Sequence, residues 1–134
     1  MFVSFNLNIN FGNQPRLVQL HPSAPQNLTG VKNADGSITV NFDEVPGAKA
    51  YVPHYGEANV SDKSQLTFMG YTETTSWTLP AADVPTHVVG DKFHICVQTF
   101  NKKGTGATDI DKARDLHDNH LGSAWSAEVI VTMN

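Results

Sequence analysis

Two histidines and four carboxylates lie close together in the last third of the sequence. The group consists of Asp109, Asp111, Asp115, His117, Asp118 and His120. Imidazole nitrogens are common zinc ligands, and carboxylates suit harder cations such as calcium. The spacing of these residues, however, matches neither an EF-hand loop nor a His-Glu-x-x-His helix. Solvated charges explain the cluster more simply, so we expect no metal ion and no other cofactor.

A histidine and a cysteine could form a second reactive pair. His94 and Cys96 lie two positions apart in a predicted strand, so their side chains share one face. A histidine next to a thiol can activate it as a nucleophile. The sequence contains no Gly-x-Ser-x-Gly motif, no phosphate-binding loop and no pair of acids placed to flank a cleft. A covered, unreactive thiol is the simpler interpretation, and we expect the chain not to be an enzyme.

Three aromatic residues outside the predicted core offer a different chemistry. Tyr71, Phe100 and Trp125 are expected at the surface, where flat rings could stack on sugars. Trp125 also lies at the start of the last predicted strand, a position that favours packing in the core. Core packing is the simpler interpretation, and carbohydrate binding stays an alternative.

The composition argues against several classes of partner. The 134 residues carry a net charge of -4, and Lys102 and Lys103 form the only basic pair, so we expect no nucleic-acid partner. No stretch is long and apolar enough to span a bilayer, and we expect no membrane association. Residues 1–11 lack both the basic region and the unbroken apolar run of a signal peptide. The chain is therefore expected to be made in the cytoplasm without export.

Most of the sequence has the pattern of short β-strands separated by turns. Strands are expected within residues 23–33, 38–42, 50–55, 66–71, 76–79, 93–97 and 125–132. Apolar residues alternate with polar ones, as in Phe93, Ile95 and Val97, which places them on one buried face. Asp35-Gly36 marks a turn between two strands. Seven short strands with little helical periodicity predict an all-β fold, a sandwich of two antiparallel sheets.

The order of these motifs resembles that of a fibronectin type III domain. The resemblance is carried by Pro-Gln-Asn-Leu at 25–28, residues 36–42, Tyr51 with residues 55–57, Thr-Thr-Ser-Trp-Thr-Leu at 74–79, residues 93–101 and residues 123–129. These segments span residues 23–134 in the order of the family. The resemblance implies the sandwich fold but says little about function, because this fold hosts adhesion, scaffold and receptor domains alike.

Three positions depart from the family pattern. Phe42 stands where the second strand usually has a tryptophan, and Phe93 stands at the position of the tyrosine corner. The hydroxyl bond of that corner is therefore absent, a loss on the order of 1 kcal/mol. Pro53 lies within a predicted strand, where its missing N–H predicts a bulge or a local edge.

Residues 1–22 lie outside the family pattern and form an expected N-terminal arm, so that the sandwich domain comprises residues 23–134. The arm alternates strictly between polar and apolar residues, and its apolar stripe consists of Val3, Phe5, Leu7, Ile9 and Phe11. A strand with one apolar face must bury that face. It either adds a strand to its own domain or pairs with a neighbouring subunit by β-addition.

The connection between residues 101 and 123 is longer than the family usually has. Asp109 is the predicted N-cap of a short helix, with Ile110, Ala113, Leu116 and His117 on one face. Long loops in compact domains often carry function. The predicted contact residues of this segment are Asp109, Arg114, His117, Asp118 and His120.

These observations favour a non-catalytic structural or binding protein. A domain of this kind without an export signal resembles small head and tail decoration proteins of bacterial viruses, which are assembled in the host cytoplasm. We therefore expect a virion component whose partners are other virion proteins or further copies of the chain, joined through the arm. The alternative is an adhesive or carbohydrate-binding module from a secreted multidomain protein.

Overall fold

The computed structural model describes residues 22–134. The apolar stripe predicted for the arm, Val3 to Phe11, lies outside the described residues, and the division into arm and domain stays a prediction.

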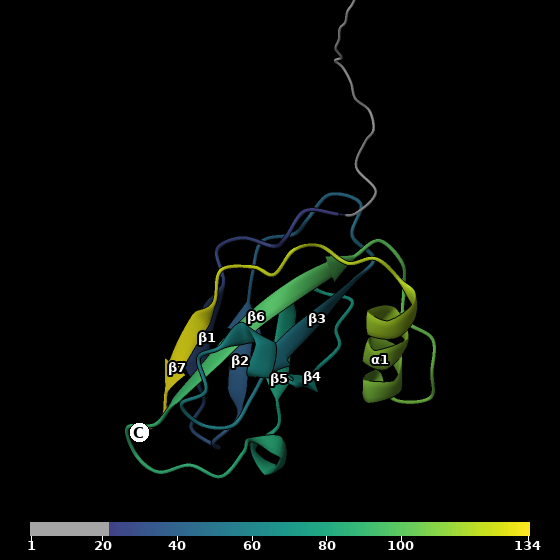
Figure 1. Ribbon diagram of the computed structural model, residues 1–134. Helices are drawn as coiled ribbons and strands as arrows, with labels where there is room; N and C mark the ends of the chain where they lie inside the picture. Colours follow the sequence, from purple (N-terminus) through teal and green to yellow (C-terminus); the bar gives the residue numbers. More distant parts are fainter. Residues whose placement is uncertain (1–21) are drawn as a thin grey trace, which may run out of the picture.

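The described chain forms two antiparallel sheets packed face to face (Figure 1). The seven strands are β1 (Thr29–Lys32), β2 (Ile38–Asn41), β3 (Ala50–Tyr55), β4 (Phe68–Met69), β5 (Ser76–Leu79), β6 (Lys92–Phe100) and β7 (Val129–Thr132). One sheet has the order β1-β2-β5, and the other has the order β4-β3-β6-β7. The predicted all-β sandwich is therefore confirmed.

The core between the sheets follows from the alternation in the sequence. Ile38 and Val40 from β2 and Ile95 and Val97 from β6 are fully buried and pack in one cluster. The cluster also contains Phe42, Tyr51, Tyr55, Trp77, Leu79 and Phe93. Because successive strand residues point to opposite faces, the intervening residues of β6 lie on the outer face of the four-stranded sheet.

That outer face is covered by the helix α1 (Asp109–Asn119), which makes the structure three layers deep (Figure 1). Ala113 and Leu116 of α1 are fully buried and pack against Val52 and Phe100 in a second apolar cluster. The cluster also includes Tyr71, and both Tyr71 (5% exposed) and Phe100 (2% exposed) are buried. The expectation that these two rings lie at the surface was therefore wrong, because a helix absent from the family pattern covers them.

The predicted helix exists, but its first turn and its buried face differ from the prediction. The N-cap is Thr108, whose hydroxyl accepts from the N–H of Asp111 over 3.1 Å, and Asp109 is the first helical residue. A threonine hydroxyl, like an aspartate carboxylate, can satisfy a free N–H of the first turn. Ile110 is 53% exposed, and His117 is also exposed. Of the four residues predicted for the buried face, Ala113 and Leu116 are buried.

Of the two outcomes predicted at Pro53, a bulge or a local edge, the bulge is not formed, and the ladder with β4 ends at His54, next to the proline. β3 pairs with β6 in a regular register from Ala50 opposite Phe100 to His54 opposite Cys96. The carbonyl of Pro53 accepts from the N–H of Gly70, so the position of the missing N–H faces β4 rather than β6. β4 is two residues long, and the proline therefore costs little pairing.

Two 3₁₀ turns, η1 (Lys63–Gln65) and η2 (Ala81–Asp83), complete the elements. The turn predicted at Asp35-Gly36 is present, and Gly36 has a φ of 92°, which favours glycine. Among residues 22–134, no helix has the length and apolar character needed to span a membrane.

Candidate functional site

Trp125 lies between two depressions of the surface, in a segment that two buried serines fasten to β6. The N–H of Ser126 donates to the carbonyl of Val97 over 3.1 Å, and its hydroxyl accepts from the N–H of Val97 over 2.9 Å. Ser123 makes the same two bonds to Thr99, each 2.9 Å long. Trp125 is therefore held in place by bonds on both sides, although β7 begins only four residues later, at Val129.

The first depression, which we call the recess, lies between β3, α1 and the segment before β4. Its volume is about 290 Å³, and it is lined by His54, Ser64, Leu66, Thr67, Met69, His117 and Trp125. His54 projects from β3 and is 3% exposed. Its ring stacks on Trp125, with the ring centroids 4.9 Å apart and the planes 26° from parallel. The recess therefore has an aromatic wall and room for one small ring or one side chain.

His54 is neutral near pH 7 because of its surroundings. Burial lowers the pKa of His54 to about 4, although the hydrogen bond to Gln98 acts in the opposite direction. Gln98 donates its amide N–H to the carbonyl of Ser123, so its amide oxygen is left to accept from Nε2–H of His54 over 2.8 Å. The ring thus carries its proton at Nε2 and serves as a donor, a poor arrangement for a general base at neutral pH.

The five predicted contact residues are spread along α1. His117 lines the recess, and its Nδ1 lies 3.2 Å from a carboxylate oxygen of Asp118. Asp109, at the start of the helix, lines a different pocket of about 190 Å³. Arg114 and His120 lie 4.0 Å and 3.8 Å from carboxylates of α1 itself. The structure therefore brings His117 alone of these five into the recess.

The carboxylate of Asp115 in α1 is engaged in structural bonds. Asp115 accepts from the side chain of Asn119 and from the N–H of Thr105, each over 3.0 Å, and these bonds lower the pKa of its carboxyl. It also lies 3.8 Å from Nε2 of His120. Within residues 22–134, no three His, Cys, Asp or Glu side chains are grouped so that they could hold a metal ion.

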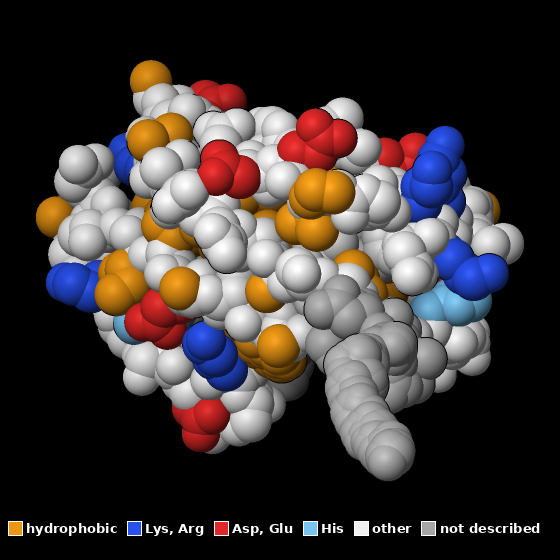
Figure 2. All heavy atoms as spheres, turned by 90° about the horizontal axis from the view of Figure 1, so that it is seen from above, with side chains coloured by type: hydrophobic (Ala, Val, Ile, Leu, Met, Phe, Trp, Pro, Cys, Tyr) orange, Lys and Arg blue, Asp and Glu red, His pale blue; other side chains and the backbone are white. Residues whose placement is uncertain are grey.

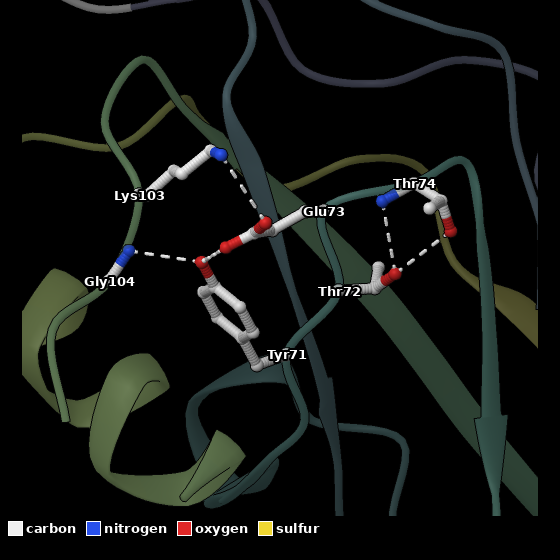
Figure 3. Close-up of polar contacts among 6 residues, drawn as sticks. All are labelled: Tyr71, Thr72, Glu73, Thr74, Lys103 and Gly104. Atoms are coloured by element: carbon white, nitrogen blue, oxygen red, sulfur yellow. Dashed lines mark hydrogen bonds and ion pairs between the residues drawn. The ribbon is translucent and has the colours of Figure 1, made fainter. Parts of the chain in front are cut away.

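The connection into α1 is fastened to the sandwich by Tyr71 (Figure 3). The hydroxyl of Tyr71 donates to Glu73 over 2.6 Å and accepts from the N–H of Gly104 over 3.0 Å. Lys103 lies 3.7 Å from the same carboxylate, and the ammonium of Lys112 lies 5.6 Å from the centre of the Tyr71 ring. Burial and the Glu73 bond raise the pKa of Tyr71 to about 12. This phenol is a structural clamp that positions the helix over the sheet.

The second depression, which we call the groove, runs between two segments that cross one end of the sandwich side by side (Figure 1). Residues 23–28, which lead into β1, form one wall, and residues 125–128, which lead into β7, form the other. Its volume is about 520 Å³. Figure 2 looks onto this end of the molecule, where small hydrophobic patches alternate with polar and charged side chains.

The predicted pair of His94 and Cys96 does not form a reactive site. Cys96 is fully buried, and burial raises the pKa of its thiol to about 12. His94 directs its Nδ1 to the carboxylate of Glu128 over 3.0 Å. The thiol therefore stays protonated, as a covered cysteine would.

Sequence reasoning missed His54 as a part of the site. The side chain lies in a strand whose six residues are all buried, and the pattern of β3 alone gives no sign of its aromatic partner. A signal for the Trp125 segment was present in the repeat Ser-Ala-Trp-Ser-Ala-Glu at 123–128, where serines recur every three residues. That period differs from the period of two in a strand and matches the two serine anchors.

No protein-family model and no curated protein matches this sequence. Solved structures do match. The protein FN3tt superposes with a TM-score of 0.54 at 14% identity, over 84% of this chain and 95% of the other. A form named FN3tt mut gives 0.53 at 14% identity, over 83% and 94%. A Fn3-like protein from Clostridium thermocellum gives 0.49 at 17% identity, over 84% and 94%.

At these identities the likeness shows the fold alone, and it is carried by FN3tt and its mutant form. The strand order of both sheets and the superposition agree with the resemblance seen in the sequence. The described chain is thus an all-β sandwich with the fibronectin type III fold, to which a helix on the outer face of one sheet has been added.

Proposed function

We propose that this chain is a non-catalytic binding domain that assembles with other protein subunits through residues 1–22. The fold is typical of binding and structural domains. The groups that could have acted as nucleophile or base support a non-catalytic role: the Cys96 thiol has a pKa raised to about 12, and the Nε2–H of His54 is bound to Gln98.

The observation that carries the proposal is that residues 22–134 form a sandwich core of their own. Residues 22–134 form two apolar clusters, and Ile38, Val40, Ile95 and Val97 in the cluster between the two sheets are fully buried. The stripe from Val3 to Phe11 supplies five further apolar side chains. Five large apolar side chains are worth about 1.5–3 kcal/mol each on burial, which favours their use in an intermolecular contact.

The proposal is tested with charge placed on one or the other face of the arm. Phe5→Asp and Ile9→Asp put a carboxylate on the apolar stripe, and Asn6→Asp and Asn8→Asp put the same charge on the polar face. Light scattering after size exclusion should show that the first pair reduces self-association and the second pair leaves it unchanged. Four variants that behave alike would contradict assembly through the stripe.

Within this proposal, the assembly we favour is the virion of a bacterial virus, with the arm anchoring the domain to a neighbour. Its support is the resemblance of a single sandwich with an apolar arm to decoration proteins. Mass spectrometry of purified particles should find the chain in a fixed ratio to the major structural proteins. Particles that lack it would refute this assignment and leave the binding domain intact.

A second candidate function, carbohydrate binding, is favoured by the recess alone. Trp125 is half-buried and lines a recess of about 290 Å³, which suits one sugar ring. Tyr71 cannot take part, because it is buried beneath α1. Glycan-array binding that disappears in Trp125→Ala and persists in Tyr71→Phe would support this candidate, and an array without signal would exclude the tested glycans.

A further inference from the structure

We propose that the groove between residues 23–28 and 125–128 receives the apolar stripe of the arm of a second copy of this chain. The inference rests on the proposed function and adds the receiving surface to it. Trp125 is the anchor of that surface.

Half of the residues that line the groove are apolar, which suits an extended segment with one apolar face. Pro25 is buried in its wall, Leu28 packs partly against the core, and the half-buried Trp125 lines the other wall. Ala24 and Ala127 also line it, and their short side chains leave space between these larger ones. Aromatic side chains such as Phe5 and Phe11 pack well against an indole ring.

Hydrogen bonds to the sandwich hold both walls of the groove in place. The two-bond anchors of Ser123 and Ser126 to β6 fix the wall that carries Trp125. The opposite wall is tied at Asp43, whose N–H donates to the carbonyl of Gln26 over 3.0 Å and whose carboxylate accepts from Asn27 over 2.6 Å. A preformed surface loses little conformational entropy when it binds a segment.

The groove lies at the point where the arm joins the domain. Ser23 lines the groove, and it also lines an adjoining pocket of about 250 Å³ with Asp43, Glu44 and Val45. Residues 1–21 therefore enter next to the surface that we assign as their receptor. When an arm and its receptor are adjacent, two copies related by a two-fold axis can exchange arms reciprocally with one type of contact.

The sequence of the arm favours exchange over a return to its own groove. Residues 23–28 form one wall, so an arm that re-entered the same groove would have to reverse within residues 12–22. Gln14-Pro15 and His21-Pro22 fall in that stretch, and a residue before proline prefers an extended backbone.

The charges of the two surfaces are complementary. Residues 1–21 contain Arg16 and no aspartate or glutamate. Glu128 lines the groove, and Asp43 and Glu44 line the adjoining pocket. An arm without acidic groups meets no repulsion there.

The inference is tested with groove variants in the full chain. Trp125→Ala and Ala127→Arg should each weaken self-association at least about tenfold, as measured by sedimentation velocity. Ala124→Arg is the matched control, because Ala124 is an exposed neighbour that does not line the groove, and it should leave association unchanged. If Phe5→Asp dissociates the assembly and both groove variants do not, the groove is the wrong surface, whereas the proposed function stands.

A cross-linking experiment identifies the copy that supplies the arm. A photoreactive benzoylphenylalanine at position 5 is placed in a mixture of unlabelled and ¹⁵N-labelled chains. Peptides covering 23–28 or 125–128 should be cross-linked between light and heavy chains. Cross-links to these peptides within single chains only would overturn the second copy, and cross-links to other peptides would overturn the groove.

Discussion

Acidification should destabilise the fold through His54, and the sign of the effect follows from its burial. The pKa of His54 falls to about 4 in the folded chain, chiefly because burial disfavours the charged ring, against an ordinary value of 6.5. Between pH 6.5 and about 4, His54 is protonated in the unfolded chain and neutral in the folded chain. The free energy of unfolding therefore decreases as the pH falls from 6.5 towards 4, and the loss levels off below that range.

The size of the effect can be worked from the two pKa values. The difference corresponds to a maximum of about 3 kcal/mol, with about 1 kcal/mol lost at pH 5.5 and most of the effect reached by pH 4.5. The groups facing His54 from the elements around it are Gln98, Trp125, His117 and the backbone of Leu66. Of these, His117 alone can gain a positive charge, and its effect on the pKa of His54 is to lower it further.

The assay compares urea unfolding of the natural chain and His54→Gln at several pH values. The substitution removes the titrating ring and has a cost of its own that does not depend on pH. The difference in unfolding free energy between the two chains should therefore shift by about 1 kcal/mol or more between pH 7 and 5.5, in favour of the variant. His87→Gln, at an exposed position, is the control for a general histidine effect. A difference that stays constant with pH would refute a neutral buried His54.

Three further predictions concern packing and the clamp on α1. Thr99→Val should stabilise the fold by about 1 kcal/mol in urea unfolding, because the hydroxyl of Thr99 is buried and, within the described residues, lacks a hydrogen-bond partner; a loss of stability would show that the hydroxyl is satisfied. Tyr71→Phe should cost about 1–2 kcal/mol and speed hydrogen exchange at the amide of Gly104, since both bonds of the phenol are lost; unchanged exchange would contradict its role as a clamp. Gly70→Ala should cost about 1–3 kcal/mol in thermal or urea unfolding, because a Cβ there would collide with the indole of Trp77; a neutral result would mean that the indole can move.

The sandwich could be predicted because its signal is local. Alternation in β2 and β6 decides which side chains lie inside, and Ile38, Val40, Ile95 and Val97 are all buried as the period of two requires. The helix could be predicted as well, since its apolar residues recur at helical spacing. Both inferences use neighbours within a few positions of each other.

The recess and the covered outer face could not be predicted in the same way. Phe100 is an apolar residue at the end of a strand, and nothing in its neighbourhood says that Leu116 will cover it. The stack of His54 on Trp125 joins residues 71 positions apart in the sequence, and the position of the proton on the His54 ring depends on a third residue, Gln98 of β6. Such contacts follow from how α1 and the serine-anchored segment pack on the sheet, which short-range patterns do not encode.

The edges of the two sheets give an independent reason to place the arm at the groove. β5 is an edge strand, and an exposed edge is the usual place for β-addition. The carbonyl of its first residue, Ser76, already accepts hydrogen bonds from the hydroxyls of Thr72 and Thr74, each over 3.0 Å. These two threonines also contact each other (Figure 3). Pro80 follows its last residue, so no long ladder can form there.

The edge strand β4 is two residues long, so it offers an added strand even fewer pairing positions than β5 does. The helix α1 also lies beside it. β7 differs from both. Its one ladder partner among the described strands is β6, and Ile130 in its middle is 46% exposed. Since β7 continues directly from residues 125–128, an arm bound in the groove would lead onto this four-residue edge strand and its exposed Ile130, although β1 lies beside part of it. Ile130→Lys should therefore weaken self-association together with Trp125→Ala, whereas Thr78→Lys on β5 should not, and the reverse order of effects would move the receiving surface to the opposite side of the sandwich.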